Sequence, residues 1–178
     1  MSKKKIVAFA GSNSSKSINR ELVKYTLSYF SEFDINLLDL NDFEMPIYSM
    51  DREQQHGIPE KANLFRKQME EANAIICSMA EHNRSYTVAF KNIFDWSSRV
   101  DLDIFKNKPM LLMSTSPGGF GGGNVMNAAK AFFPKCGAEV IETFSLPSFY
   151  KTFSEGEILD PDLKEELIQK IEVFRKAL

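Results

Sequence analysis

The sequence has few cysteines, no long hydrophobic run and little net charge. Its 178 residues include two cysteines, Cys77 and Cys136, which stand far apart and form no CxxC pair. Two isolated cysteines exclude a disulfide framework and the paired cysteines of a zinc site, so no metal site is expected. So few cysteines are typical of proteins in the reducing cytoplasm. No apolar stretch approaches the length of a transmembrane helix. The apolar run at residues 6–10 is too short for the core of a secretory signal.

The charges nearly balance, since 22 Lys and Arg stand against 24 Asp and Glu and the formal net charge is −2. This balance provides no overall attraction to nucleic acid or to an anionic membrane, so we expect neither as a partner. The length is that of one domain, and residues 1–178 are predicted to form a single unit with a core of two or three layers.

The most informative stretch is residues 11–20, a hydroxyl-rich loop between an apolar strand and a helix. The first backbone N–H groups of a helix lack internal partners and carry partial positive charge, so such a junction binds phosphate well. An ordinary capped turn would need one serine or asparagine, and the larger number present favours a phosphate loop. The proposed phosphate ligands are Ser12, Ser14, Ser17 and Asn19.

The rest of the chain alternates strands with helices. Five repeats of this kind predict an α/β fold, a doubly wound parallel sheet with helices on both faces. Residues 41–57 are predicted to be a long loop. Hydrophobic spacing places strands at 5–10, 34–40, 74–79, 109–113 and 139–145, and helices at 17–31, 58–72, 88–99, 124–135 and 161–178.

Three loops rich in serine, asparagine or glycine follow apolar strands, at residues 11–19, 80–87 and 114–122. In the strand order 2-1-3-4-5 these strands are neighbours, and ligands bind at the carboxyl ends of such sheets, as FMN does in flavodoxin. We therefore expect the loops to line one crevice. The first loop is no Walker A motif, and the third lacks the last glycine of a dinucleotide fingerprint, because Asn124 stands there. Its glycines suit either a backbone passing close to a flat ligand or a flexible turn.

The loops resemble those of the NAD(P)H-dependent FMN reductase family, in order and along the whole chain. Departures occur at Ser14, Ala80, His82 and Thr87, where the family commonly has Arg, Pro, Tyr and Pro. The motifs that carry the resemblance are Gly11-Ser12-x4-Ser17-x-Asn19-x2-Leu22, Glu81-x-Asn83-x-Ser85-Tyr86 with Phe90-Lys91-Asn92-x2-Asp95-Trp96, and Ser116-Pro117-Gly118-Gly119-Phe120-Gly121-Gly122.

The resemblance implies a flavodoxin-like fold that binds FMN and passes hydride from NADPH or NADH to a flavin, quinone, azo compound or metal oxyanion. The flavin would carry the chemistry, so no catalytic side chain is expected. A homodimer or homotetramer is implied too, and the aromatic residues Phe144, Phe149, Tyr150 and Phe153 favour it. The resemblance places the FMN phosphate against Ser12, Ser14, Ser17 and Asn19. It places the pyrimidine edge and the N5 side of the flavin along the backbone of Glu81, His82 and Asn83. The other edge of the flavin would lie at Ser116, Pro117, Gly118 and Gly119.

Two questions stay open at this stage. With serine at position 14, the positive charge near the phosphate would come from Lys16 or Arg20, and Lys16 is the better candidate because the charge of Arg20 opposes the helix dipole. The alternative functions are an electron carrier between protein partners and an interaction domain without flavin. The nearly balanced charge argues against a carrier, because carriers gain from electrostatic steering.

Overall fold

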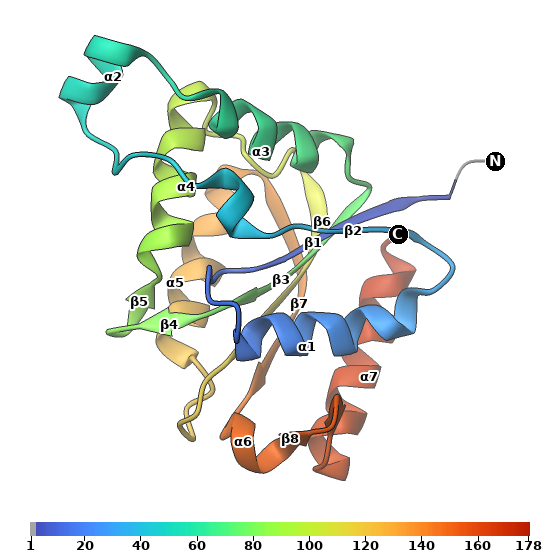
Figure 1. The fold of residues 1–178 in the computed structure, drawn as a ribbon. Helices are drawn as coiled ribbons and strands as arrows, with labels where there is room; N and C mark the ends of the chain where they lie inside the picture. Colours follow the sequence, from blue (N-terminus) through green and yellow to red (C-terminus); the bar gives the residue numbers. More distant parts are fainter. Residues whose placement is uncertain (1–2) are drawn as a thin grey trace.

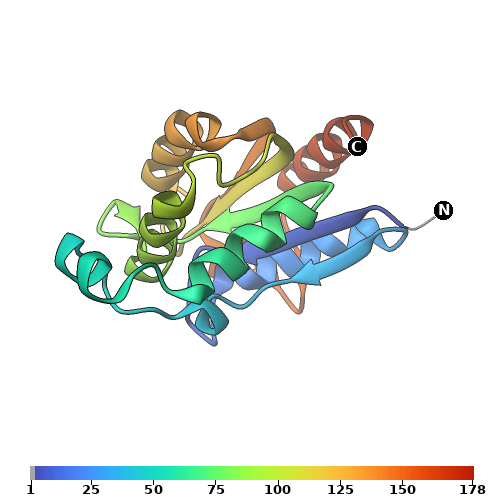
Figure 2. The same cartoon turned by 90° about the horizontal axis from the view of Figure 1, so that it is seen from above.

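The computed structural model describes residues 3–178 and places a five-stranded parallel sheet between two layers of helices (Figure 1 and Figure 2). The strand order is β2-β1-β3-β6-β7. Because β6 and β7 are the fourth and fifth sheet strands along the chain, this confirms the predicted flavodoxin-like order. The strands are β1 (Lys5–Ala10), β2 (Asp34–Leu37), β3 (Ala74–Met79), β6 (Lys108–Thr115) and β7 (Ala138–Leu146).

The helices divide between the two faces of the sheet. In Figure 1, α3, α4 and α5 lie to the upper left of the sheet, and α1 and α7 lie below it to the right. Strand residues alternate between these faces: Val7 and Phe9 pack with the first group, whereas Ile6 and Ala8 pack with the second. Both faces are covered, which explains the unbroken apolar run of β1. The helices are α1 (Ile18–Leu27), α2 (Met50–His56), α3 (Glu60–Glu71), α4 (Val88–Val100), α5 (Gly123–Phe132), α6 (Phe149–Thr152) and α7 (Pro161–Lys176).

The segment predicted as a long loop, residues 41–57, contains a 3-10 turn and the helix α2. Ser49 caps α2 by accepting a hydrogen bond from the Arg52 N–H, and Gly57 ends it with a φ of 73°. Spacing could not reveal this helix because none of its residues is buried. Among residues 3–178, no helix is long and apolar enough to cross a membrane.

The aromatic residues after β7 are arranged differently from our expectation. Phe144, Phe149 and Phe153 are buried in the core beneath α1 and α7, and the Phe149 and Phe153 rings stack at 4.8 Å between centroids. Only Tyr150 in this group is exposed, at 72%. The inference that these aromatics form an apolar surface for a second subunit was therefore wrong, because three of the four fill the protein's own core.

Candidate active site

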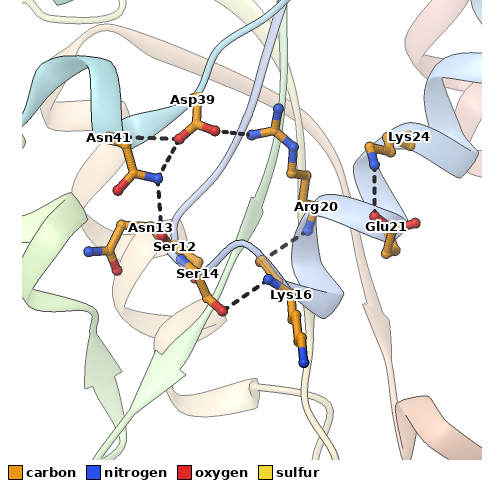
Figure 3. Close-up of polar contacts among 10 residues, drawn as sticks. Ser12, Asn13, Ser14, Lys16, Arg20, Glu21, Lys24, Asp39 and Asn41 are labelled. Atoms are coloured by element: carbon orange, nitrogen blue, oxygen red, sulfur yellow. Dashed lines mark hydrogen bonds and ion pairs between the residues drawn. The ribbon is translucent and has the colours of Figure 1, made fainter.

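The first loop is curled by its own serine hydroxyls (Figure 3). The Ser12 hydroxyl accepts a hydrogen bond from the Ser14 N–H, and the Ser14 hydroxyl accepts one from the Lys16 N–H, each at 3.2 Å. Ser17 caps α1 by accepting from the Arg20 N–H. Since each hydroxyl still has its own proton to donate, the three serines can hold an acceptor oxygen while they shape the loop.

Asn19 lies beneath this loop rather than at its surface, with 2% of its area exposed. Its Oδ1 accepts hydrogen bonds from the Thr115 N–H at 3.1 Å and from the Ser78 hydroxyl at 2.6 Å. Its Nδ2 donates to the Thr115 oxygen at 3.1 Å. The carboxamide thus joins the start of α1 to the ends of β3 and β6, which is the work of a positioning residue.

The second loop, residues 80–87, contains a tight hairpin of β4 (Glu81–His82) and β5 (Ser85–Tyr86). Its turn residues, Asn83 and Arg84, have positive φ values of 51° and 63°, and such strain is common at functional sites. Thr87, where the family commonly has proline, caps α4 and donates from its hydroxyl to the Gly11 oxygen at 2.8 Å. The departure from the family pattern therefore adds a direct bond between the first and second loops.

The side chain of Glu81 has a role that the sequence did not reveal. Its carboxylate accepts hydrogen bonds from the Val125 N–H at 2.9 Å and from the Asn124 side chain at 3.1 Å. These groups lie in the first turn of α5, where a negative charge is favourable. Glu81 thus fastens the hairpin to α5, and its backbone remains available to line the site.

The third loop begins at residue 116 rather than 114, because β6 extends to Thr115, and backbone bonds fix it to the start of α6. Phe149 N–H donates to the Ser116 oxygen at 3.0 Å, and Ser148 N–H donates to the Gly118 oxygen at 2.9 Å. Gly121 has a φ of 60°, and a Cβ there would lie 3.2 Å from the backbone of Leu146. Glycine at position 121 therefore meets a conformational and packing need. At Gly118 and Gly119 an added Cβ would meet nothing closer than 3.9 Å, so the backbone is open there.

The three loops meet around one cavity of about 280 Å³, which we call the three-loop cleft. Of the predicted site residues, Asn83, Gly118 and Gly119 lie outside its lining. Tyr150 belongs to the lining, although the sequence gave it no place in the site. The lining residues are Ser12, Ser14, Lys16, Ser17, Ile18, Asn19, Ala80, Glu81, His82, Thr115, Ser116, Pro117 and Tyr150.

The positive charge in the cleft comes from Lys16. Arg20 is directed to Asp39, with a distance of 3.0 Å between its Nη1 and the Asp39 Oδ2, while the Lys16 side chain extends away from this pair (Figure 3). A hydrogen bond from the Asn41 backbone N–H, with a smaller contribution from Arg20, holds the pKa of Asp39 below its usual range. Of the two candidates for the charge near the phosphate, Lys16 lines the three-loop cleft and Arg20 does not.

The residues of the second signature that follow the hairpin have structural roles. The Asn92 side chain donates to the Met45 and Pro46 oxygens and accepts from the Tyr48 N–H, and the Trp96 indole donates to the Pro46 oxygen at 2.7 Å. They hold the segment before α2 against α4. Lys91 pairs with Asp95 on the exposed face of α4, so the polar residues of this signature also serve the structure.

Solved structures with the same fold come from several oxidoreductases. The flavoenzyme NAD(P)H:(acceptor) oxidoreductase FerB from Paracoccus denitrificans has a TM-score of 0.72 and 24% identity, and the match covers 97% of this chain and 98% of FerB. An FMN-dependent NADH-azoreductase from Bacillus anthracis, solved in complex with FMN, has a TM-score of 0.63 and 18% identity, over 99% and 98% of the two chains. At these identities the similarity establishes the fold.

Relatives found by comparing sequences share a higher identity with this chain than these two structures do. An NADPH:quinone oxidoreductase from Arabidopsis thaliana is 28% identical over 174 residues, which cover 93% of this chain and 87% of that protein. A 2-hydroxy-1,4-benzoquinone reductase from a Burkholderia species is 31% identical over 119 residues, which cover 66% and 63%. The family model described as NADPH-dependent FMN reductase matches residues 4–151. The chain therefore belongs to the NADPH-dependent FMN reductase family and is an oxidoreductase that uses FMN with NADPH or NADH.

Proposed function

We propose that this protein holds FMN in the three-loop cleft and reduces quinones at the expense of NADPH or NADH. The observation that carries the proposal is the meeting of a phosphate loop and two further loops around one cleft at the carboxyl ends of β1, β3 and β6. Quinones are preferred among the possible acceptors because the relatives from Arabidopsis and Burkholderia are named as quinone reductases.

The donor set of the first loop fits a phosphate. Ser12, Ser14 and Ser17 have hydroxyl protons to donate, Lys16 adds a positive charge, and the N-terminus of α1 adds its dipole. This combination would bind a dianion through charge-assisted hydrogen bonds, which are the stronger kind. Ser12, Ser14, Lys16 and Ser17 are therefore assigned to the phosphate, with Asn19 holding the loop in place from below.

The other two loops would orient the ring system. When bound, FMN supplies the hydride chemistry, so the protein's task is position and electrostatics. Glu81 fixes the hairpin, so that the backbone of His82 and Asn83 can face one edge of the ring. Ser116 and Pro117 line the cleft, and the open backbone at Gly118 and Gly119 lies just beyond them, where a flat ring could approach closely.

A purified holoenzyme tests the proposal directly. Under anaerobic conditions, NADPH or NADH alone should bleach the flavin absorbance, and 1,4-benzoquinone should restore it. Bleaching that requires a partner reductase would instead indicate an electron carrier. A colourless protein that ignores added FMN would contradict the proposal and favour an interaction domain.

Two finer points belong to the same proposal. The resemblance to the family motivates a homodimer or homotetramer, and a clean monomer in sedimentation velocity at micromolar concentration would contradict it. A cytoplasmic location accords with the thiols of Cys77 and Cys136, which are both free and buried. Fractionation of the source cells would test it.

A further inference from the structure

A second cavity, of about 240 Å³, shares His82 with the three-loop cleft. We call it the α4 cavity, because one wall is the first two turns of α4 and the other is the chain from residue 40 to residue 47. None of the roles assigned above uses this space. Its position beside the second loop places it next to the edge of the site where the flavin ring is expected.

About half of the lining of the α4 cavity is apolar. Phe43, Met45 and Ile93 form buried surface, with at most 7% of each residue exposed. At the mouth, Ile47 and Val88 are 58% and 68% exposed, which is a large exposure for such side chains. Apolar side chains that remain in water around a concave site favour a ligand with apolar surface of its own.

The cavity is held in shape by hydrogen bonds that need no ligand. Asn92 on α4 bonds to the Met45 and Pro46 oxygens and to the Tyr48 N–H, so the outer wall is fastened to the helix. Asn41 donates to the Asn13 oxygen at 3.1 Å, which joins the same wall to the first loop (Figure 3). Because these bonds already order the walls, little conformational entropy is lost when a ligand binds.

Size and charge limit what the cavity can hold. At about 240 Å³ the α4 cavity is smaller than the three-loop cleft assigned to FMN, so it suits a ligand of one or two rings rather than a second nucleotide. Its lining contains the carboxylate of Glu44 and no lysine or arginine, which disfavours phosphates and metal oxyanions. The first N–H groups of α4, at Val88 and Ala89, lack helical partners and suit a neutral oxygen acceptor.

We propose that the α4 cavity is a second binding site, for a neutral acceptor that has one or two rings and a carbonyl oxygen. The ring would lie between Ile47 and Val88, with its oxygen toward the first turn of α4 and its edge toward His82. The inference rests on the proposed function, since the acceptor must reach a reduced flavin beyond His82. Beyond that function, the inference specifies where the acceptor binds and that the acceptor is uncharged.

Two variants test the site. Ala89→Leu fills the cavity from its helical wall, and Val88→Asp places a negative charge at its mouth, where an acidic residue in the first turn of a helix is favourable. Val173→Asp is the matched control, because Val173 is a 45% exposed valine on α7, far along the chain and outside the cavity. Melting temperatures of all three holoenzymes show whether each variant is folded.

The readouts separate binding from turnover. We expect both cavity variants to raise the KM for 1,4-naphthoquinone by about tenfold or more, because they remove apolar contact or place a charge against a neutral ring. The KM for ferricyanide, an anion too polar for this site, should stay within about twofold of wild type, a change well under 1.4 kcal/mol. The Kd of 1-tetralone, a bicyclic ketone that the flavin does not reduce, should rise in parallel in calorimetry with the oxidised holoenzyme.

Each result decides one question. If folded Ala89→Leu and Val88→Asp bind 1-tetralone and reduce 1,4-naphthoquinone as Val173→Asp does, the α4 cavity is not an acceptor site, although the proposed function stands. If NADPH fails to bleach wild-type flavin, the proposed function fails. In that case, loss of 1-tetralone binding in Ala89→Leu would still support the site, and retained binding would overturn it.

Discussion

The carboxamide of Asn19 pairs with both backbone polar groups of Thr115, accepting from its N–H and donating to its oxygen, each at 3.1 Å. Thr115 is the last residue of β6 and directly precedes the third loop. Asn19 is in the first turn of α1, just behind the phosphate loop. One buried side chain therefore sets the spacing between two of the three loops.

The first prediction is that Asn19→Ala destabilises the protein more than Ser17→Ala. The alanine at position 19 leaves the buried N–H and oxygen of Thr115 unpaired, and we expect a loss of about 2–4 kcal/mol in the free energy of unfolding. Ser17→Ala removes a helix cap and should cost about 1 kcal/mol. Denaturation in urea, followed by circular dichroism, measures both.

Both variants should also weaken FMN, Ser17→Ala by a lost contact and Asn19→Ala through a displaced loop. The matched control is Ser28→Ala, at the other end of α1, where the hydroxyl donates to the Tyr25 oxygen. If Asn19→Ala proves as stable as Ser28→Ala and loses FMN affinity all the same, the carboxamide contacts the phosphate directly and its positioning role is wrong.

The second prediction concerns the choice of flavin. A loop that offers three hydroxyls and Lys16 to a terminal phosphate should bind FMN at least about tenfold more tightly than riboflavin, the effect of one or two charge-assisted hydrogen bonds. FAD should bind more weakly than FMN, because its phosphate is extended into a diphosphate. Quenching of flavin fluorescence during titration of the apoprotein gives the three Kd values. Equal affinity for riboflavin and FMN would remove the basis for the phosphate loop.

The third prediction tests the link between the hairpin and α5. Glu81→Gln keeps an oxygen near the Val125 N–H but removes the negative charge from the helix N-terminus, so we expect a loss of about 0.5–1 kcal/mol in stability. The loosened hairpin should raise the Kd of FMN. Glu139→Gln, at an exposed position of β7, is the control and should change neither. An unchanged Kd in a destabilised Glu81→Gln protein would mean that the hairpin backbone does not contact FMN.

The sheet and the three loops could be predicted because each has a strong local signal. Apolar runs such as residues 6–10 follow from burial on both faces, and parallel order then brings the loop ends together. Other features depend on partners far along the chain. The carboxylate of Glu81 reaches α5, and nothing near position 81 shows this.

The aromatic cluster after β7 shows the same limit. Phe153 packs edge-on against Tyr25 of α1 at 5.8 Å, so a residue that looks like apolar surface in the sequence is core in the structure. Tyr150, its neighbour in the chain, remains 72% exposed and lines the three-loop cleft. The sequence alone does not show which of these four aromatic residues are core and which line the site, because that depends on which rings reach α1, as Phe153 does at Tyr25.

The last prediction concerns the missing arginine at position 14. Serine there donates one hydrogen bond and adds no charge, and Arg20 is paired with Asp39, so Lys16 is the positive side chain in the lining of the cleft. Ser14→Arg should strengthen FMN binding by about 1 kcal/mol, a modest gain because position 14 is exposed to solvent. Lys16→Ala should weaken binding and flatten its dependence on salt. Lys24→Ala, on α1 and paired with Glu21, is the matched control. Titrations at low and high salt measure all three, and if Ser14→Arg and Lys16→Ala both bind FMN as wild type does at low salt, backbone N–H groups and hydroxyls hold the phosphate without help from side-chain charge.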